Sequence, residues 1–310
     1  PHRLMEGKRL ARENKKDAEE KQKKPLPLWI IYLLPSMLIF TLFVIYPFVK
    51  TIVTSFFATS NTGALTQMVG LSNYISLFTS ETYLHSLGTT FLYTILTVPL
   101  TVVISLLLAV LSSSNLPGMG VFRTIFSSTM GISVAAGSVF WNLLFHHTAG
   151  LLNRVVQWFG GEPIGWLTDT NFAVYSIAAV SIWMNIGFSY LVLMGGLKNI
   201  DDSHYESVEI VGGGFFYRLR KVTIPLISPS LFFVVTISLI NAFQSFGLID
   251  MLTGGGPNNS TNLMVYKLYN DAFVNFRFGS ASAQGIVLFI LIFLISRLQT
   301  KLTERLVTYQ

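Results

Sequence analysis

The stretch HYESVEIVGGGFFYRLRKVTIPLISP, residues 204–229, decides how the rest of the chain is interpreted. It is polar, rich in glycine and carries a basic run, yet long apolar segments lie on both sides of it. Ser203, followed three residues later by Glu206, matches a capping box, in which each side chain bonds a free amide at the start of a helix. The pattern predicts a short helix that the glycines end after about two turns.

One face of this short helix carries Tyr205, Val208 and Gly212 at helical spacing. A helix of this length buries little surface within its own chain. It therefore either docks into a partner protein or is a simple connecting turn, and the residues alone leave both alternatives open.

The segments around the insert are apolar enough to cross a membrane. The chain is 51% hydrophobic and 12% charged, with a mean hydropathy of +0.56. A bilayer core of about 30 Å needs about 20 helical residues, and lipid offers no partner to unpaired backbone groups. The sequence therefore predicts an all-α polytopic membrane protein with six transmembrane helices. The predicted spans are residues 28–49, 88–111, 121–145, 172–196, 226–249 and 281–298.

Positive charge is distributed unequally between the connecting segments. Residues 1–27, 112–123, 197–224 and 297–310 hold nine, one, four and three Lys or Arg, whereas the alternate loops 50–87, 146–171 and 250–280 hold one, one and two. The positive-inside rule then predicts that the insert and both termini are cytoplasmic. The net charge of +6 follows from this bias, so it is no argument for nucleic-acid binding.

Residues 1–27 form a charged cytoplasmic tail in this prediction. Acidic and basic side chains alternate along it, which is typical of a solvated helix or of a disordered segment. An electrostatic anchor to anionic membrane lipid is the functional alternative.

The residues needed for an enzyme are absent from the sequence. There is no cysteine and no phosphate-binding G-x-x-x-x-G-K-[ST] loop, and the adjacent histidines His146 and His147 make a poor metal chelate. No histidine or carboxylate lies within a predicted span, which also argues against an ion-coupled secondary transporter or a membrane enzyme. We expect a protein that is not an enzyme and has no cofactor or metal site.

The insert resembles the EAA loop of permeases in binding-protein-dependent ABC importers, whose pattern is E-A-A-x-x-x-G followed by I-x-L-P. Glu206 takes the glutamate position, Gly212 the glycine six residues on, and residues 222–225 the closing element. Residues 207–208 replace the alanines, and Val211 stands where an aspartate is common. Over residues 28–310 two further stretches are similar to the carbohydrate branch, which includes maltose and glycerol-3-phosphate permeases: VGLSNYISLF (69–78) and FQSFGLIDMLTGGGP (243–257). The closing LTERLVTYQ (302–310) is similar to the same branch.

The resemblance implies a type I ABC importer permease fold over residues 28–310, with 204–229 as the cytoplasmic coupling loop. It also implies a location in the cell membrane of a prokaryote. The implied partners are a second permease subunit, two ATPase subunits that bind ATP and Mg, and an extracellular substrate-binding protein. The residues implied to couple to the ATPase are Tyr205, Glu206, Val208, Gly212 and Pro225.

Two predicted spans carry polar and aromatic side chains at helical spacing, which suit a neutral polyol through hydrogen bonds and ring contact. Hydrogen bonding between helices is the alternative use of such residues. By resemblance to the maltose-type permease, the substrate-binding positions are Trp183, Ile186, Gly187, Tyr190, Ser238, Asn241, Ala242 and Ser245. The residue pattern alone indicates a polar stripe of Ser238, Asn241 and Ser245 on the fifth span, with Gln244 adjacent. On the fourth span it indicates a face formed by Trp183, Gly187 and Tyr190, with Asn185 beside it.

The charge of the substrate can also be inferred from these two spans. Neither the fourth nor the fifth predicted span carries Lys or Arg in its interior, and a phosphate group would be expected to bind one. The sequence therefore favours a neutral mono- or oligosaccharide over glycerol-3-phosphate or another small polar solute. A second permease subunit could still supply the charge.

Overall fold

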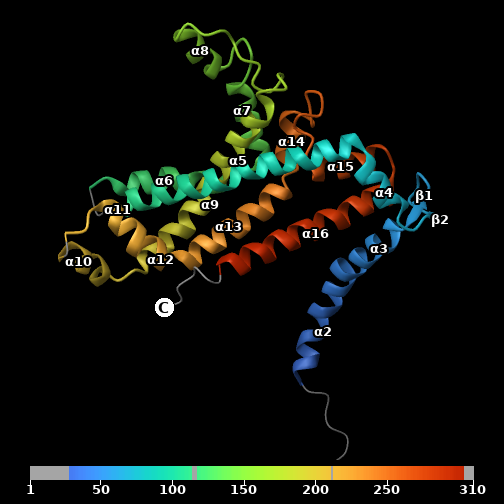
Figure 1. Ribbon diagram of the computed structural model, residues 1–310, viewed down its shortest axis with the longest axis horizontal. Helices are drawn as coiled ribbons and strands as arrows, with labels where there is room; N and C mark the ends of the chain where they lie inside the picture. Colours follow the sequence, from blue (N-terminus) through green and yellow to red (C-terminus); the bar gives the residue numbers. More distant parts are fainter. Residues whose placement is uncertain (1–27, 114–116, 211, 304–310) are drawn as a thin grey trace, which may run out of the picture. The chain divides into compact units, whose positions relative to one another are not determined.

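The computed structural model describes residues 28–113, 117–210 and 212–303, with side chains from residue 32 (Figure 1). The chain consists of two compact units, Pro1–Val53 and Thr54–Gln310. The predicted tail 1–27 and the end of the chain lie outside the described residues. In chain order, with η marking π or 3-10 helix, the elements are α2 (Leu28–Phe40), η1 (Thr41–Ile45), α3 (Tyr46–Ser55), β1 (Phe57–Thr59), β2 (Leu65–Met68), α4 (Ser72–Thr79), α5 (Glu81–Ser112), α6 (Met119–Ser128), η2 (Thr129–Gly131), α7 (Val134–Leu144), α8 (Leu151–Trp158), α9 (Ala173–Lys198), α10 (Asp202–Ile210), α11 (Phe215–Arg218), η3 (Leu219–Thr223), α12 (Ile224–Leu226), α13 (Ser228–Phe243), α14 (Gly247–Leu252), α15 (Met264–Tyr269), η4 (Asn270–Val274) and α16 (Phe278–Thr303).

The first candidate membrane span is longer than predicted. It runs over Tyr32–Ser55, through α2, η1 and α3, and so continues past the expected end at residue 49. Pro47 does not stop the helix. The π-helical turn η1 precedes it, and Tyr46 N–H bonds there to the Thr41 carbonyl. Such turns shift the hydrogen-bond register, so the missing amide of a proline can be accommodated.

Three more helices of the described chain are long and apolar enough to span a membrane by themselves: α5, α9 and α16. The start of α5 was predicted at residue 88, but the helix begins at Glu81. Ser80 caps it there, since its hydroxyl accepts a hydrogen bond from Tyr83 N–H. At about 1.5 Å per residue, this helix is longer than the hydrocarbon core is thick.

The third predicted span is a broken helix, and a second break lies at the start of the fifth predicted span. The segments Met119–Gly131 and Val134–Leu144 meet at 107°, and Phe215–Leu226 meets Ser228–Phe243 at 74°. At the first break Ile132 is extended, and the Ser133 hydroxyl caps the next helix by accepting from Ala136 N–H. Six spans result only if each bent pair counts as one span.

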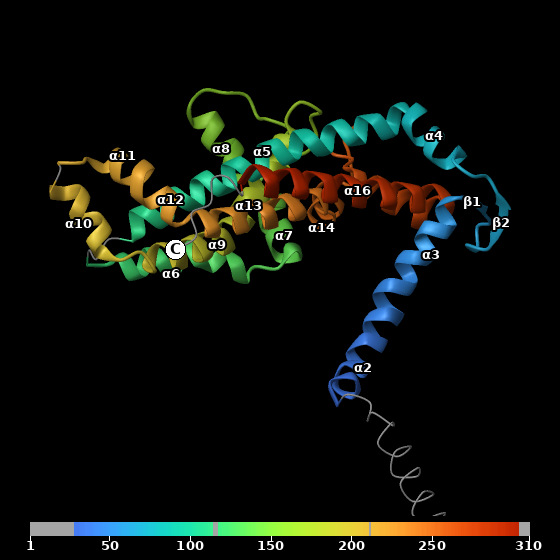
Figure 2. The same ribbon diagram turned by 60° about the horizontal axis from the view of Figure 1, so that its bottom comes forward.

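The core of the second unit forms around α5, which packs against α9 and α13. Tyr93 of α5 and Ile177 of α9 are fully buried in this core. The only strands among the described residues are β1 and β2, a short antiparallel hairpin. Figures 1 and 2 both place α10 and α11 at one end of this unit, and the hairpin with α4 at the opposite end.

Candidate functional site

The predicted short helix exists as α10, but its start differs from the expected capping box. The helix begins at Asp202, so Ser203 lies within the first turn and does not precede it. The Ser203 amide donates to the Asp201 carboxylate over 2.8 Å. The Ser203 side chain first, and this amide second, lower the pKa of Asp201 through hydrogen bonds. The capping role predicted for Glu206 was therefore wrong, since Asp201 accepts from that amide.

The glycines end α10 as predicted. Gly212 N–H bonds to the Glu209 carbonyl, and Gly213 N–H bonds to the Val208 carbonyl, both over 2.9 Å. This pair of bonds is the Schellman arrangement, in which the residue after the helix is left-handed. Gly212 has φ +74°. A side chain at this position would strain the backbone.

The inward face of α10 packs on its own chain. Tyr205 contacts a buried cluster at the ends of α5 and α9 that includes Tyr190 and Leu193. Its hydroxyl lies 3.3 Å from Thr223 Oγ1, and the Arg218 guanidinium lies 5.0 Å above its ring. Tyr205 therefore holds α10 against the spans. Val208 is half-buried and packs so closely on Gly213 that a side chain at residue 213 would clash with it.

The exposed side chains of α10 and α11 include a carboxylate and two large apolar groups. Glu206 is exposed, Ile210 is 86% exposed one turn further on, and Phe216 of α11 is 81% exposed. Exposed apolar side chains around a charge are typical of a protein-binding surface. The sequence pattern had indicated Glu206 but not Ile210 or Phe216. Pro225 lies in α12, which joins the hairpin to the bent fifth span.

A narrow polar cavity lies between α5, α9 and α13. It brings together four predicted substrate positions, and every described residue that lines it is uncharged. Its free volume is about 10 Å³, room for about one water molecule. The lining residues are Thr97, Val98, Thr101, Ser181, Asn185, Ser238, Asn241 and Ala242.

Thr97, Thr101 and Ser181 line this cavity but were not predicted from the sequence. Hydroxyl side chains recur along one side of α5 at helical spacing, and this pattern was available in the sequence. Several of them bond to carbonyls of their own helix: Thr97 Oγ1, for example, donates to the Tyr93 carbonyl over 2.8 Å.

Three other predicted positions have structural contacts away from the cavity. Tyr190 is 1% exposed and its hydroxyl lies 2.8 Å from Ser112 Oγ. Trp183 stacks on Phe140, with ring centroids 5.9 Å apart. The Ile186 carbonyl accepts a hydrogen bond from Ser105 Oγ over 3.4 Å. The structure therefore does not bring these three residues together with Asn241.

Gly187 is a contact point between helices. Its amide lies 3.0 Å from Thr129 Oγ1 in η2. A Cβ atom at this position would lie 2.5 Å from Thr129 Oγ1 and 2.6 Å from the Met130 amide nitrogen. Only glycine fits without a shift of the neighbouring helix, so the structure gives Gly187 a packing role.

The predicted polar stripe on the fifth span is interrupted before its last members. The helix α13 ends at Phe243, so Gln244 and Ser245 lie in the break before α14. Ser245 Oγ lies 3.1 Å from the hydroxyl of Tyr93 in α5. Gln244 is exposed and lines a different groove, next to Phe289 of α16.

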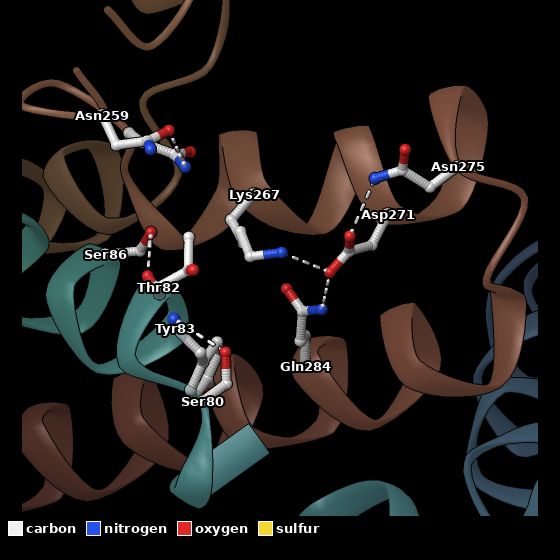
Figure 3. A network of polar contacts seen from close by, with 10 residues as sticks. Ser80, Thr82, Tyr83, Ser86, Asn259, Lys267, Asp271, Asn275 and Gln284 are labelled. Atoms are coloured by element: carbon white, nitrogen blue, oxygen red, sulfur yellow. Dashed lines mark hydrogen bonds and ion pairs between the residues drawn. The ribbon is translucent and has the colours of Figure 1, made fainter. Parts of the chain in front are cut away.

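A charged network around Asp271 was also not predicted from the sequence (Figure 3). Asp271 Oδ2 accepts from Lys267 Nζ over 2.8 Å and from Gln284 Nε2 over 2.6 Å, and its Oδ1 accepts from Asn275 Nδ2 over 3.1 Å. Burial raises the pKa of Asp271, but these hydrogen bonds and the Lys267 charge outweigh it, so the pKa lies below its ordinary value. The network fixes the α15–η4 segment to α16.

The chain is similar to transport proteins along nearly all of its length. The family model described as "Binding-protein-dependent transport system inner membrane component" matches residues 80–308. The sn-glycerol-3-phosphate transport system permease protein UgpA of Agrobacterium fabrum is 30% identical over 278 residues, which cover 89% of this chain and 94% of that protein. UgpA of Yersinia enterocolitica is 31% identical over 287 residues, with 91% and 96% covered.

A solved structure has a similar fold at low sequence identity. It is a chain of a bacterial ABC transporter involved in the import of the acidic polysaccharide alginate. The TM-score is 0.77 at 20% identity, and the alignment covers 97% of this chain and 100% of that chain.

Proposed function

Since the chain belongs to the binding-protein-dependent transport system inner membrane components, we propose that it is a permease subunit of an ATP-driven importer for a neutral sugar. Family membership makes it the membrane component of its transport system and not the ATPase. It is accordingly a multi-pass protein of the inner membrane. The proposed partners are a second permease, two ATPase subunits and an extracellular substrate-binding protein.

The proposal that the substrate is a neutral sugar rests on one observation. The cavity between α5, α9 and α13 presents hydroxyl and amide groups, and every described residue of its lining is uncharged. Asn and Ser side chains can both donate to and accept from sugar hydroxyls. A phosphate group would favour a cationic partner, and the interiors of these three helices contain no Lys or Arg.

The small volume of the cavity is consistent with a transporter in which the helices move. A free volume of about 10 Å³ is too small for a sugar. Substrate would enter only when α5, α9 and α13 separate, as in the rigid-body rocking of transporters around a central site.

Glycerol-3-phosphate is the second candidate substrate. It is favoured by the names of the relatives from Agrobacterium fabrum and Yersinia enterocolitica, which align over almost their full length. A cation supplied by the second permease would make that substrate compatible with the uncharged cavity.

Uptake by the assembled transporter in proteoliposomes tests the proposal. With its partners present, we expect uptake of a neutral sugar and not of glycerol-3-phosphate. Asn241→Leu should lower kcat/KM roughly tenfold, because a hydrogen bond worth about 1.5 kcal/mol is lost. Gln244→Leu is the matched control, since Gln244 lines another groove, and it should transport normally.

Two results would contradict different parts of the proposal. Uptake of glycerol-3-phosphate alone would refute the substrate class and leave the permease role intact. Transport by this chain without an ATPase would refute the permease role itself.

A further inference from the structure

A groove of about 530 Å³ lies beside α10, the helix proposed to contact the ATPase and called the coupling helix below, and it is separate from the substrate cavity. Its walls come from the ends of α5 and α9 and from the α10–α11–η3 segment. The volume falls within the range of about 300–1,000 Å³ that is typical of small-molecule sites.

The polar part of the lining carries a positive charge. Lys198 ends α9 and is exposed, and Arg218 of α11 also lines the groove, with its guanidinium over the ring of Tyr205. Asp202 is the one carboxylate among the described lining residues. Glu209 approaches Arg218 only to 3.5 Å, and its own side chain is 71% exposed. An ion pair this exposed is weak, so Arg218 can bind another anion.

Much of the remaining lining is apolar, and a free anion such as phosphate would gain nothing from contact with it. Phe215 is 53% exposed beside Arg218, and Val110 and Leu219 extend the apolar wall. A ligand that satisfies both parts of the groove has an anionic head and a hydrocarbon body. Basic pockets between transmembrane helices on the cytoplasmic side bind lipid headgroups of this kind.

We propose that this groove binds an anionic phospholipid of the cytoplasmic leaflet, with the headgroup phosphate between Lys198 and Arg218 and an acyl chain along Phe215. The ends of α5 and α9 are the ends of membrane spans, so the groove opens where headgroups lie. The groove is assigned to the cytoplasmic leaflet because the positive-inside rule predicts that α10 lies on the cytoplasmic side.

A lipid in this groove would also affect coupling. Tyr205 and Asp202 of α10 are part of the lining. A bound lipid therefore contacts the coupling helix and the spans at once, and it stabilises their packing. We expect the ATPase activity of the assembled transporter to depend on anionic lipid.

The test uses the assembled transporter in nanodiscs of phosphatidylcholine into which phosphatidylglycerol is titrated. Lipid retained by the purified complex is measured by native mass spectrometry, and ATP hydrolysis is measured in parallel. The combined Lys198→Gln and Arg218→Gln variant should bind phosphatidylglycerol roughly 30-fold more weakly, since each basic group contributes about fivefold. Stimulation of ATP hydrolysis by this lipid should be lost with it.

The matched control removes the same number of positive charges from η3, the segment that follows Arg218. Arg220 and Lys221 are exposed and do not line the groove. Their combined change to glutamine should leave retained phosphatidylglycerol unchanged. Equal loss in both double variants would refute the site and indicate general surface attraction.

Two further outcomes would also overturn the proposal. Inorganic phosphate that reproduces the stimulation in pure phosphatidylcholine would make the ligand a soluble phosphate. Loss of the ATPase subunits from the Lys198→Gln and Arg218→Gln complex would make the groove part of a protein interface. Lipid retention is measured without transport, so it does not depend on which substrate the importer carries.

Discussion

Replacing Gly187 with alanine tests whether this glycine is needed for helix packing. Its amide hydrogen-bonds Thr129 Oγ1 over 3.0 Å, and α9 meets η2 at this point. The new Cβ would lie 2.6 Å from the Met130 amide nitrogen, which belongs to the backbone and cannot rotate away. Ordinary contacts between such atoms are about 3.5 Å or more, so η2 must shift by about 1 Å.

The expected cost follows from this shift. Overpacking of this kind costs about 1–3 kcal/mol, and loss of the hydrogen bond to Thr129 costs about 1 kcal/mol. Gly195→Ala is the control. Gly195 also lies in α9, and a Cβ there would have no neighbouring atom within 4 Å. Both variants gain the same helix propensity of about 1 kcal/mol. Gly187→Ala should therefore be less stable than Gly195→Ala by about 2–4 kcal/mol.

Thermal stability of the purified transporter measures the difference. We expect Tm to be about 4–8 °C lower for Gly187→Ala than for Gly195→Ala, at about 2 °C per kcal/mol for a chain of this size. Equal Tm values would refute the packing argument. If Gly187→Ala then had a transport defect alone, the glycine would instead belong to the substrate path.

The remaining predictions concern the charged network and the topology. Asp271→Asn should lower stability by about 3 kcal/mol at neutral pH, because it leaves Lys267 partly buried without its counter-charge. The depressed pKa of Asp271 means that its contribution is complete above about pH 4 and is lost as the pH falls through the folded-state pKa. The Tm difference between the unmodified protein and Asp271→Asn should accordingly narrow as the pH falls below about 4, and a difference that stays constant there would contradict the assignment. Cysteines introduced at Ser60 and Asn259 should react with an impermeant reagent outside the cell, and one at Ser203 should not; labelling at Ser203 would reverse the topology.

The straight spans could be predicted because hydropathy depends only on composition along the helix. The window 172–196 differs from α9 by two residues at most. The break between η2 and α7 could not be found in this way, because Ile132 is as apolar as its neighbours. The only signs of the break in the sequence are Gly131, which ends η2, and Ser133, a residue type that caps the start of a helix.

The candidate site was predictable where its chemistry is local. Asn185 and Asn241 were predicted as polar side chains in apolar spans, and both line the cavity. The contacts of Tyr190 could not be foreseen, since its partner Ser112 is 78 residues away in the sequence. Asp271 and Lys267 were four residues apart and recognisable, but the bond to Gln284 again depends on tertiary packing.

The central claim is that α10 couples this permease to an ATPase through its outward face. Substrate-stimulated ATP hydrolysis by the assembled transporter carrying Glu206→Ala tests it most directly, with Glu162→Ala as a control for an exposed carboxylate elsewhere. Removing one member of a desolvated charge pair at an interface costs about 2–5 kcal/mol, so we expect stimulation to fall at least about 30-fold in Glu206→Ala and to stay normal in Glu162→Ala. Hydrolysis at the unmodified rate by an intact Glu206→Ala complex would contradict the claim and leave α10 as a connecting turn.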